Sequence, residues 1–176
     1  MESGIDAGLL ILRVVVGGVM MFHGTQKLLG WWGGEGLNGT AAFFDRQGFR
    51  PPKVMAAIAG CIETIGGALF GAGLFVSIAA VLLVSTLVNV VILHARNGLD
   101  RKKNGFEYEL VLLAAVAGIA LTGPGAYALD PLFRVDVAKY FTHLVGVDTS
   151  IAWGAIMILA GAAGGIVVAS TRRRKA

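Results

Sequence analysis

Long apolar segments follow one another along the chain, and none of them alternates between polar and apolar positions as a β-strand would. We predict membrane-spanning helices, because about 20 apolar residues cross the hydrocarbon core and a helix satisfies its own backbone there. The expected fold class is therefore all-α: a polytopic membrane protein with a four-helix transmembrane bundle and a fifth C-terminal transmembrane helix. The predicted spans cover residues 6–29, 54–73, 76–94, 107–122 and 151–170.

Composition agrees with a membrane class. Hydrophobic residues make up 56% of the 176-residue chain, glycine occurs 26 times, and the mean hydropathy is +0.74. The single cysteine, Cys61, excludes an internal disulfide or a CxxC redox pair. Residues 1–7, ahead of the first apolar run, include Glu2 and Asp6 but no Lys or Arg, so we expect a mature span rather than a signal peptide.

Basic residues set the expected orientation. The net charge of +4 comes from clusters that flank the apolar segments, which is a topology pattern and argues against nucleic-acid binding. With five spans, only Arg134 and Lys139 fall on the opposite side, so we expect the N-terminus outside and the C-terminus in the cytoplasm. The twelve residues on the predicted cytoplasmic side are Lys27, Arg46, Arg50, Lys53, Arg96, Arg101, Lys102, Lys103, Arg172, Arg173, Arg174 and Lys175.

Two further patterns concern packing. Residues 33–53 form a loop in which Thr40 is expected to cap a short helix over residues 40–47. The last span carries Gly161 and Gly165, a GxxxG pair without any charge nearby, which predicts a close-packing face. That face would serve either packing on the bundle or a homo-oligomer.

Ionisable and polar side chains inside the spans are the candidate chemistry. His23 and Lys27 lie one helical turn apart, and Gly24 between them would let another backbone approach closely. Charges in hydrocarbon are costly and usually face a polar interior or a partner. With the topology above, these residues converge in the cytoplasmic half of the membrane. The predicted ligand-binding or proton-handling pocket contains His23, Lys27, Glu63, Asn89, Glu107 and Glu109.

Structural explanations stand beside this prediction. Glu107 and Glu109 are also favoured simply by the helix dipole, and being two apart they point to different faces, so at most one should enter a pocket. Lys27 could snorkel to the headgroups. Glu63 has to be either neutral or paired with a cation such as Arg13 or Lys27, and Arg13 with Glu63 is the expected structural ion pair. The pattern assigns no catalytic residue and no metal site.

Five motifs in order resemble those of the DoxX family of small bacterial membrane proteins, over about residues 9–130. The resemblance implies a four-helix bundle in residues 1–130, with residues 131–176 as an extension of outer loop, fifth helix and basic tail, all in the bacterial inner membrane. The motifs are MFHGTQKLLGW, GTAAFFDRQGF, ETIGGALFGAGL, NGFEYELVLLAAVAGIAL and GPGAYALD.

The resemblance also implies a function. Family members are named for the membrane subunit of a thiosulfate:quinone oxidoreductase, and relatives are linked to thiol and oxidative-stress complexes. We therefore expect a non-catalytic membrane component of a redox assembly that docks soluble enzymes at its cytoplasmic face, with quinone as the candidate ligand. A proton-coupled transporter using Glu63 and His23 is the alternative, and a structural scaffold is the third hypothesis.

Overall fold

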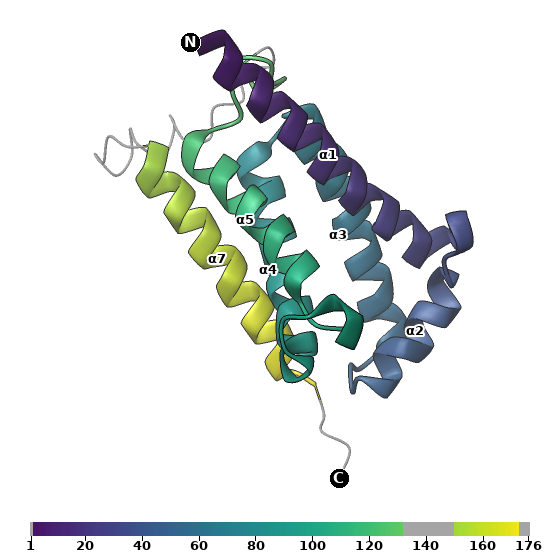
Figure 1. Ribbon diagram of the computed structural model, residues 1–176. Coiled ribbons are helices and arrows are strands. Elements are labelled where there is room, and N and C mark those ends of the chain that lie inside the picture. Colours follow the sequence, from purple (N-terminus) through teal and green to yellow (C-terminus); the bar gives the residue numbers. More distant parts are fainter. Residues whose placement is uncertain (1, 132–149, 173–176) are drawn as a thin grey trace.

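The computed structural model describes residues 2–131 and 150–172, and this part of the chain is entirely helical apart from its turns and loops (Figure 1). The expected all-α fold class is confirmed. Arg134 and Lys139 of the predicted outer loop lie outside the described residues, as do the last three basic residues of the tail. The helices are α1 (Glu2–Leu29), α2 (Gly36–Arg46), α3 (Pro52–Ala72), α4 (Val76–His94), α5 (Glu107–Thr122) and α7 (Ser150–Ser170), with 3-10 turns at Trp31–Gly33, Ala95–Asn97 and Arg101–Lys103.

Four of these helices, α1, α3, α4 and α7, are long and apolar enough to cross a membrane. The fourth predicted span, α5, has 16 residues and so measures about 24 Å, somewhat less than the hydrocarbon core. It ends at Gly123, whose positive φ of 83° suits a residue without a side chain. Because α5 lies beside α4 and α7, it is nonetheless part of the bundle.

Small residues bring α1 and α3 together as an antiparallel pair. A side chain at Gly17 would overlap the backbone of Gly67 and Gly71 on α3. The expected close approach at Gly24 is also present, against Gly60 and Thr64. The two helices therefore touch through their backbones along much of their length, which fixes the faces that α1 and α3 turn inward.

The GxxxG face of α7 packs on α4. Side chains at Gly161 and Gly165 would collide with Val84, Ser85 and Val88, and Asn89 Nδ2 donates a hydrogen bond of 3.2 Å to the Gly165 carbonyl. The alternative prediction of a homo-oligomer through Gly161 and Gly165 is therefore wrong, because α4 of the same chain covers this face.

The helix predicted in the first loop begins earlier than expected, at Gly36, so Thr40 lies inside it rather than at its N-cap. The Thr40 hydroxyl instead donates to the carbonyl of Lys27, at 3.2 Å. This bond ties α2 to the last turn of α1, close to the polar residues predicted to form a pocket.

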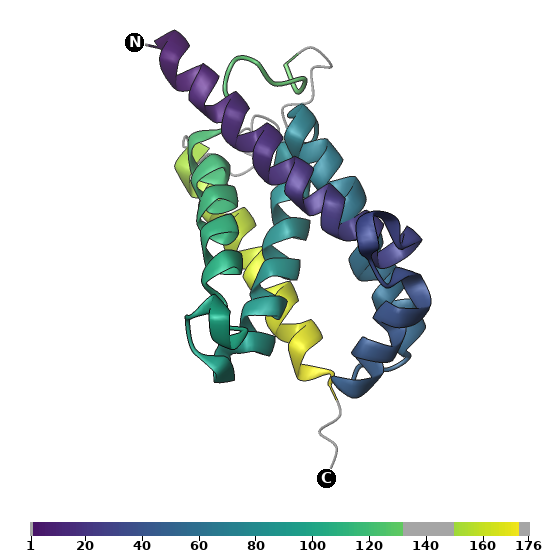
Figure 2. The ribbon, with the colours of Figure 1, turned by 45° about the vertical axis from the view of Figure 1, so that its right-hand side comes forward.

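The two ends of the bundle differ in their contents. Helix α1 begins at one end, here called the N-terminal end, and α7 finishes at the other, here called the C-terminal end (Figures 1 and 2). An apolar core occupies the middle and the N-terminal end, with Phe70, Leu83 and Val116 among its fully buried members. His23, Lys27, Glu63, Asn89 and Glu109 line cavities toward the C-terminal end, where α2 also lies. Asp6 and Arg13 of α1 lie at the N-terminal end, against the loop after α5.

Candidate functional site

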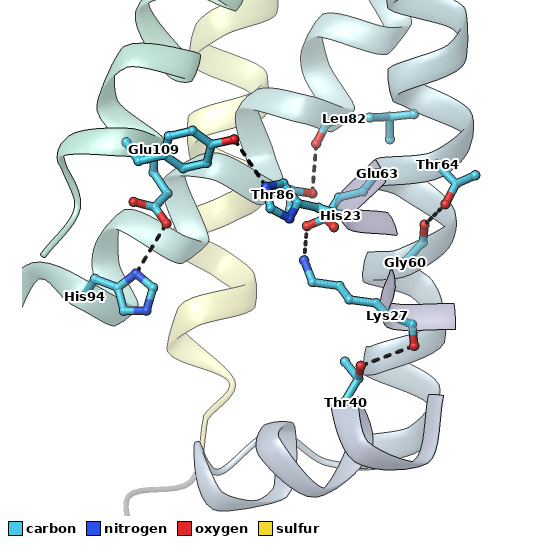
Figure 3. A network of polar contacts seen from close by, with 11 residues as sticks. His23, Lys27, Thr40, Gly60, Glu63, Thr64, Leu82, Thr86, His94 and Glu109 are labelled. Carbon is cyan, nitrogen blue, oxygen red and sulfur yellow. Dashed lines mark hydrogen bonds and ion pairs between the residues drawn. The ribbon is translucent and has the colours of Figure 1, made fainter. Parts of the chain in front are cut away.

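An ion pair between Lys27 of α1 and Glu63 of α3 forms the centre of the site (Figure 3). Glu63 is 2% exposed, and its Oε1 accepts the hydrogen bond from Lys27 Nζ. Its Oε2 has no hydrogen-bond partner among the described residues. One carboxylate oxygen is therefore paired with Lys27, and the other is free to accept a hydrogen bond from a ligand.

The predicted ion pair of Arg13 with Glu63 is wrong. Arg13 is fully buried at the N-terminal end, and its Nη2 donates to the Tyr127 carbonyl at 2.9 Å. Positions 13 and 27 are separated by about 21 Å along α1, so the two cations belong to opposite ends of the bundle. Lys27 is therefore the partner of Glu63, and Arg13 holds the loop that follows α5.

His23, one turn before Lys27, contacts α5. Its Nε2 lies 3.2 Å from the hydroxyl of Tyr108, and the two rings meet edge to face with centroids 5.9 Å apart. The guanidinium of Arg101 lies over the Tyr108 ring, 4.8 Å from its centroid. This row of contacts links α1 to the start of α5.

Tyr108 and Arg101 were missed as site residues by the sequence reasoning. One signal was present: Tyr108 shares a face with Leu112 and Val116, at steps of four residues, and both of these are buried. A tyrosine on such a face places its hydroxyl inside the bundle. No comparable signal exists for Arg101, which reaches the site from a 3-10 turn.

His94, at the end of α4, faces Glu109 of α5, with 3.6 Å between Nδ1 and Oε1. Oε2 of Glu109 is buried and has no hydrogen-bond partner in the described part of the chain. Glu107, by contrast, is exposed. Only one of the two neighbouring acids turns inward, as their spacing requires.

These side chains surround a cavity of about 320 Å³ between α1, α3, α4 and α5, and Figure 3 shows the open space between the His94 and Lys27 groups. A second cavity of about 390 Å³ continues toward α2, and His23, Lys27 and His94 line both. Asn89 lines the second cavity. The first cavity is lined by Met20, His23, Lys27, Glu63, Thr86, Leu87, Val90, His94, Arg101, Asn104, Gly105, Tyr108, Glu109 and Leu112.

The arrangement offers both hydrogen-bond donors and acceptors to a small molecule. Lys27 has donors beyond the one that binds Glu63, and the carboxylates of Glu63 and Glu109 each have an oxygen without a partner among the described residues. Among those residues, no three His, Cys, Asp or Glu side chains lie close enough to hold a metal ion. The side chains present offer hydrogen bonding, charge pairing and proton exchange.

Comparison with known proteins identifies one family model, DoxX, which matches residues 8–96. The match runs from α1 to the turn after α4 and includes His23, Lys27, Glu63 and Asn89. It ends before Tyr108 and Glu109. No curated protein and no solved structure matches the chain.

Proposed function

This chain belongs to the DoxX family of membrane proteins, and from that premise we propose that it is the membrane component of a redox assembly and binds a quinone in the cavity between α1, α3, α4 and α5. The assembly is of the thiol, thiosulfate or oxidative-stress kind, and the chain itself is a non-catalytic subunit. The observation that carries the proposal is the cavity, where ionisable groups from separate helices face one space inside a membrane bundle.

The size and chemistry of the cavity suit a single substituted ring. At about 320 Å³ it is at the lower end of the range for ligand pockets. The carbonyl oxygens of a quinone accept hydrogen bonds, which Lys27 and Tyr108 are able to donate. The hydroxyls of the reduced quinol donate hydrogen bonds, and the unpartnered oxygens of Glu63 and Glu109 are able to accept them. Both redox forms therefore find complementary groups.

The C-terminal end of the bundle supplies a surface for soluble partners. Its described basic residues are Lys27, Arg46, Arg50, Lys53, Arg96, Arg101, Lys102, Lys103 and Arg172. Such a concentration is typical of the cytoplasmic side, so this end faces the cytoplasm and the protein lies in the bacterial inner membrane. A soluble redox enzyme with an acidic surface would dock there.

The apolar core favours a binding site over a transport path. Phe70, Val116 and Ile119 are at most 1% exposed and lie between the cavity and the N-terminal end. A polar solute crossing the bundle would have to pass these side chains. The transporter alternative thus requires a second conformation, whereas quinone binding requires none. The scaffold hypothesis leaves the unpartnered carboxylate oxygens unexplained.

The test is binding of a tail-less dimethoxy-methyl-benzoquinone and its quinol to the protein in detergent, followed as a rise in Tm. Wild type should be stabilised, and Glu63→Gln and His23→Ala should each weaken binding about tenfold or more. Glu107→Gln is the matched control, since Glu107 is an exposed acid beside the same site. Equal binding by all four proteins, or no binding by wild type, would refute the quinone site.

A separate experiment tests the orientation. A reporter enzyme that works only in the cytoplasm should be active when it is fused after Ala176. A reporter that works only outside the cytoplasm should be active when it is fused before Met1. Both reporters on one side of the membrane would contradict the five-helix topology.

A further inference from the structure

A narrow slot leaves the polar cavity between α3 and α4. Its volume is about 90 Å³, and its inner end is lined by Lys27, Glu63 and Asn89. Most of the other lining residues are apolar, and they come chiefly from α3: Met55, Ile58, Ala59 and Ile62, with Val90 of α4, Phe44 of α2 and Val168 of α7. Ser85 and Thr86 of α4 add two hydroxyl groups. Lys27, Glu63, Thr86 and Val90 line both the slot and the main cavity, so the two spaces adjoin at the Lys27–Glu63 ion pair.

The slot opens on the side of the bundle. Helices α3 and α4 meet at the turn around Gly73 and separate toward the C-terminal end, as the two views show (Figures 1 and 2). Ile58 lies on this side and is 48% exposed, on a helix that is apolar enough to span a membrane. The mouth of the slot therefore faces lipid.

We propose that this slot holds the apolar tail of a ligand whose polar ring occupies the cavity, and that the ligand arrives from the bilayer between α3 and α4. The ligand class is an amphipathic molecule with a compact polar ring and a long hydrocarbon or isoprenoid chain. This inference rests on the proposed function, because it assigns a tail to the ring-binding site, but the two are separable by experiment.

Glu63 connects the two parts. It is 2% exposed, and its Oε2 lacks a hydrogen-bond partner among the described residues. A ligand hydroxyl bound to that oxygen would lie at the junction of cavity and slot. A hydrocarbon chain attached to the same ring would then run through the slot along Ile62 and Ile58. These two side chains are apolar, so an apolar chain leaves none of their atoms without a hydrogen-bond partner.

The dimensions of the slot suit a chain. About 90 Å³ is the volume of about three water molecules, which leaves room for a short length of chain and not for a second ring. The remaining length of the chain would continue into the lipid. Since each methylene group is costly to expose to water, a long-tailed ligand partitions into the bilayer and reaches the site from there.

The experiment compares two probes and two variants of the full chain in detergent. The probes are the tail-less dimethoxy-methyl-benzoquinone and the same ring with a decyl tail, each corrected for partition into empty micelles. Ile58→Trp fills the slot, and Ile65→Trp is the control because Ile65 is also exposed on α3, at 57%, but does not line the slot. Ile58→Trp should weaken binding of the decyl probe about tenfold while leaving the tail-less ring unaffected, and Ile65→Trp should change neither.

Unchanged binding of the ring by Ile58→Trp also shows that the cavity is intact in that variant. As a measurement that needs no variant, a decyl probe with a diazirine on the third carbon of its chain, counted from the ring, should cross-link wild type at Met55, Ile58 or Ile62. If Ile58→Trp binds both probes as wild type does, or if cross-links fall only on residues outside the slot, the tail site is refuted and the ring site stands. If wild type binds neither probe, the proposed function falls and the tail site falls with it.

Discussion

At the N-terminal end of the bundle, buried and half-buried charges bind backbone groups, whereas at the C-terminal end they bind one another across a cavity. Asp130 accepts hydrogen bonds from the backbone N–H groups of Phe75 and Val76, at 2.6 and 3.1 Å. Asp6 accepts one from the N–H of Ala126 at 2.8 Å. These acids fasten the loop after α5 to the start of α4 and to α1.

Arg13 also holds the loop after α5 against α1. It donates to the Tyr127 carbonyl, and its guanidinium fills the space that a side chain at Gly73 would need. At the other end, the partners of Lys27 and His94 are the side chains Glu63 and Glu109, and each of these acids has an oxygen without a partner in the described chain. Backbone partners are fixed by the fold, but side-chain pairs beside a cavity are able to exchange for a ligand.

An ionisable residue within a membrane helix is therefore not by itself a sign of a binding site. Arg13 is more deeply buried than Lys27, and its Nε and Nη1 also lack a hydrogen-bond partner in the described chain, yet it holds a loop. The informative observation is a buried polar atom without a partner next to open space. Substitutions at three places in the bundle test this contrast between the two ends.

The largest effect is expected at the Lys27–Glu63 pair. Glu63→Gln removes the anion and strands the ammonium of Lys27, which should cost about 1 to 4 kcal/mol of unfolding free energy. The double variant Glu63→Gln with Lys27→Met should recover most of this loss, because it removes the cation as well. Thermal or denaturant unfolding in detergent measures both changes. If Glu63→Gln alone leaves stability unchanged, the carboxyl is neutral and the ion pair does not exist in the protein.

A smaller effect is expected at the opposite end. Asp130→Ala leaves the N–H groups of Phe75 and Val76 without their acceptor at the start of α4, and should cost about 1 to 2 kcal/mol. Asp130→Asn keeps one acceptor oxygen and should cost less. Quinone binding should be the same in both variants as in wild type. Loss of quinone binding would show that the two ends of the bundle are coupled. The charges at the N-terminal end would then not be purely structural.

The smallest loss of stability is expected for Tyr108→Phe. It removes only the hydroxyl that meets His23 Nε2, worth about 0.5 to 1.5 kcal/mol, and keeps the ring beside Arg101. Because the same hydroxyl faces the cavity, binding of the tail-less benzoquinone should weaken as well. Stability lowered with binding intact would make Tyr108 a purely structural residue, like Asp130.

The amino-acid sequence alone was sufficient for the helices and for part of the site. Apolar length sets the spans, since a backbone in lipid has to be helical, and the observed bounds of α4 and α5 agree with the predicted ones. The four-residue spacing put His23 and Lys27 on one face, and the two-residue spacing of Glu107 and Glu109 meant that only one acid could turn inward.

Partner choice depended on how the helices pack. Local spacing does not show which cation faces Glu63, because that depends on the register of α1 against α3, which Gly17, Gly24 and Gly67 set through backbone contact. Nor does it show that α4 covers Gly161 and Gly165, since a small-residue face suits a neighbour in the same chain as well as one in another. Tyr108 and Arg101 join the site for the same reason: contacts between distant segments follow from three-dimensional packing, whereas helix formation follows from the local pattern.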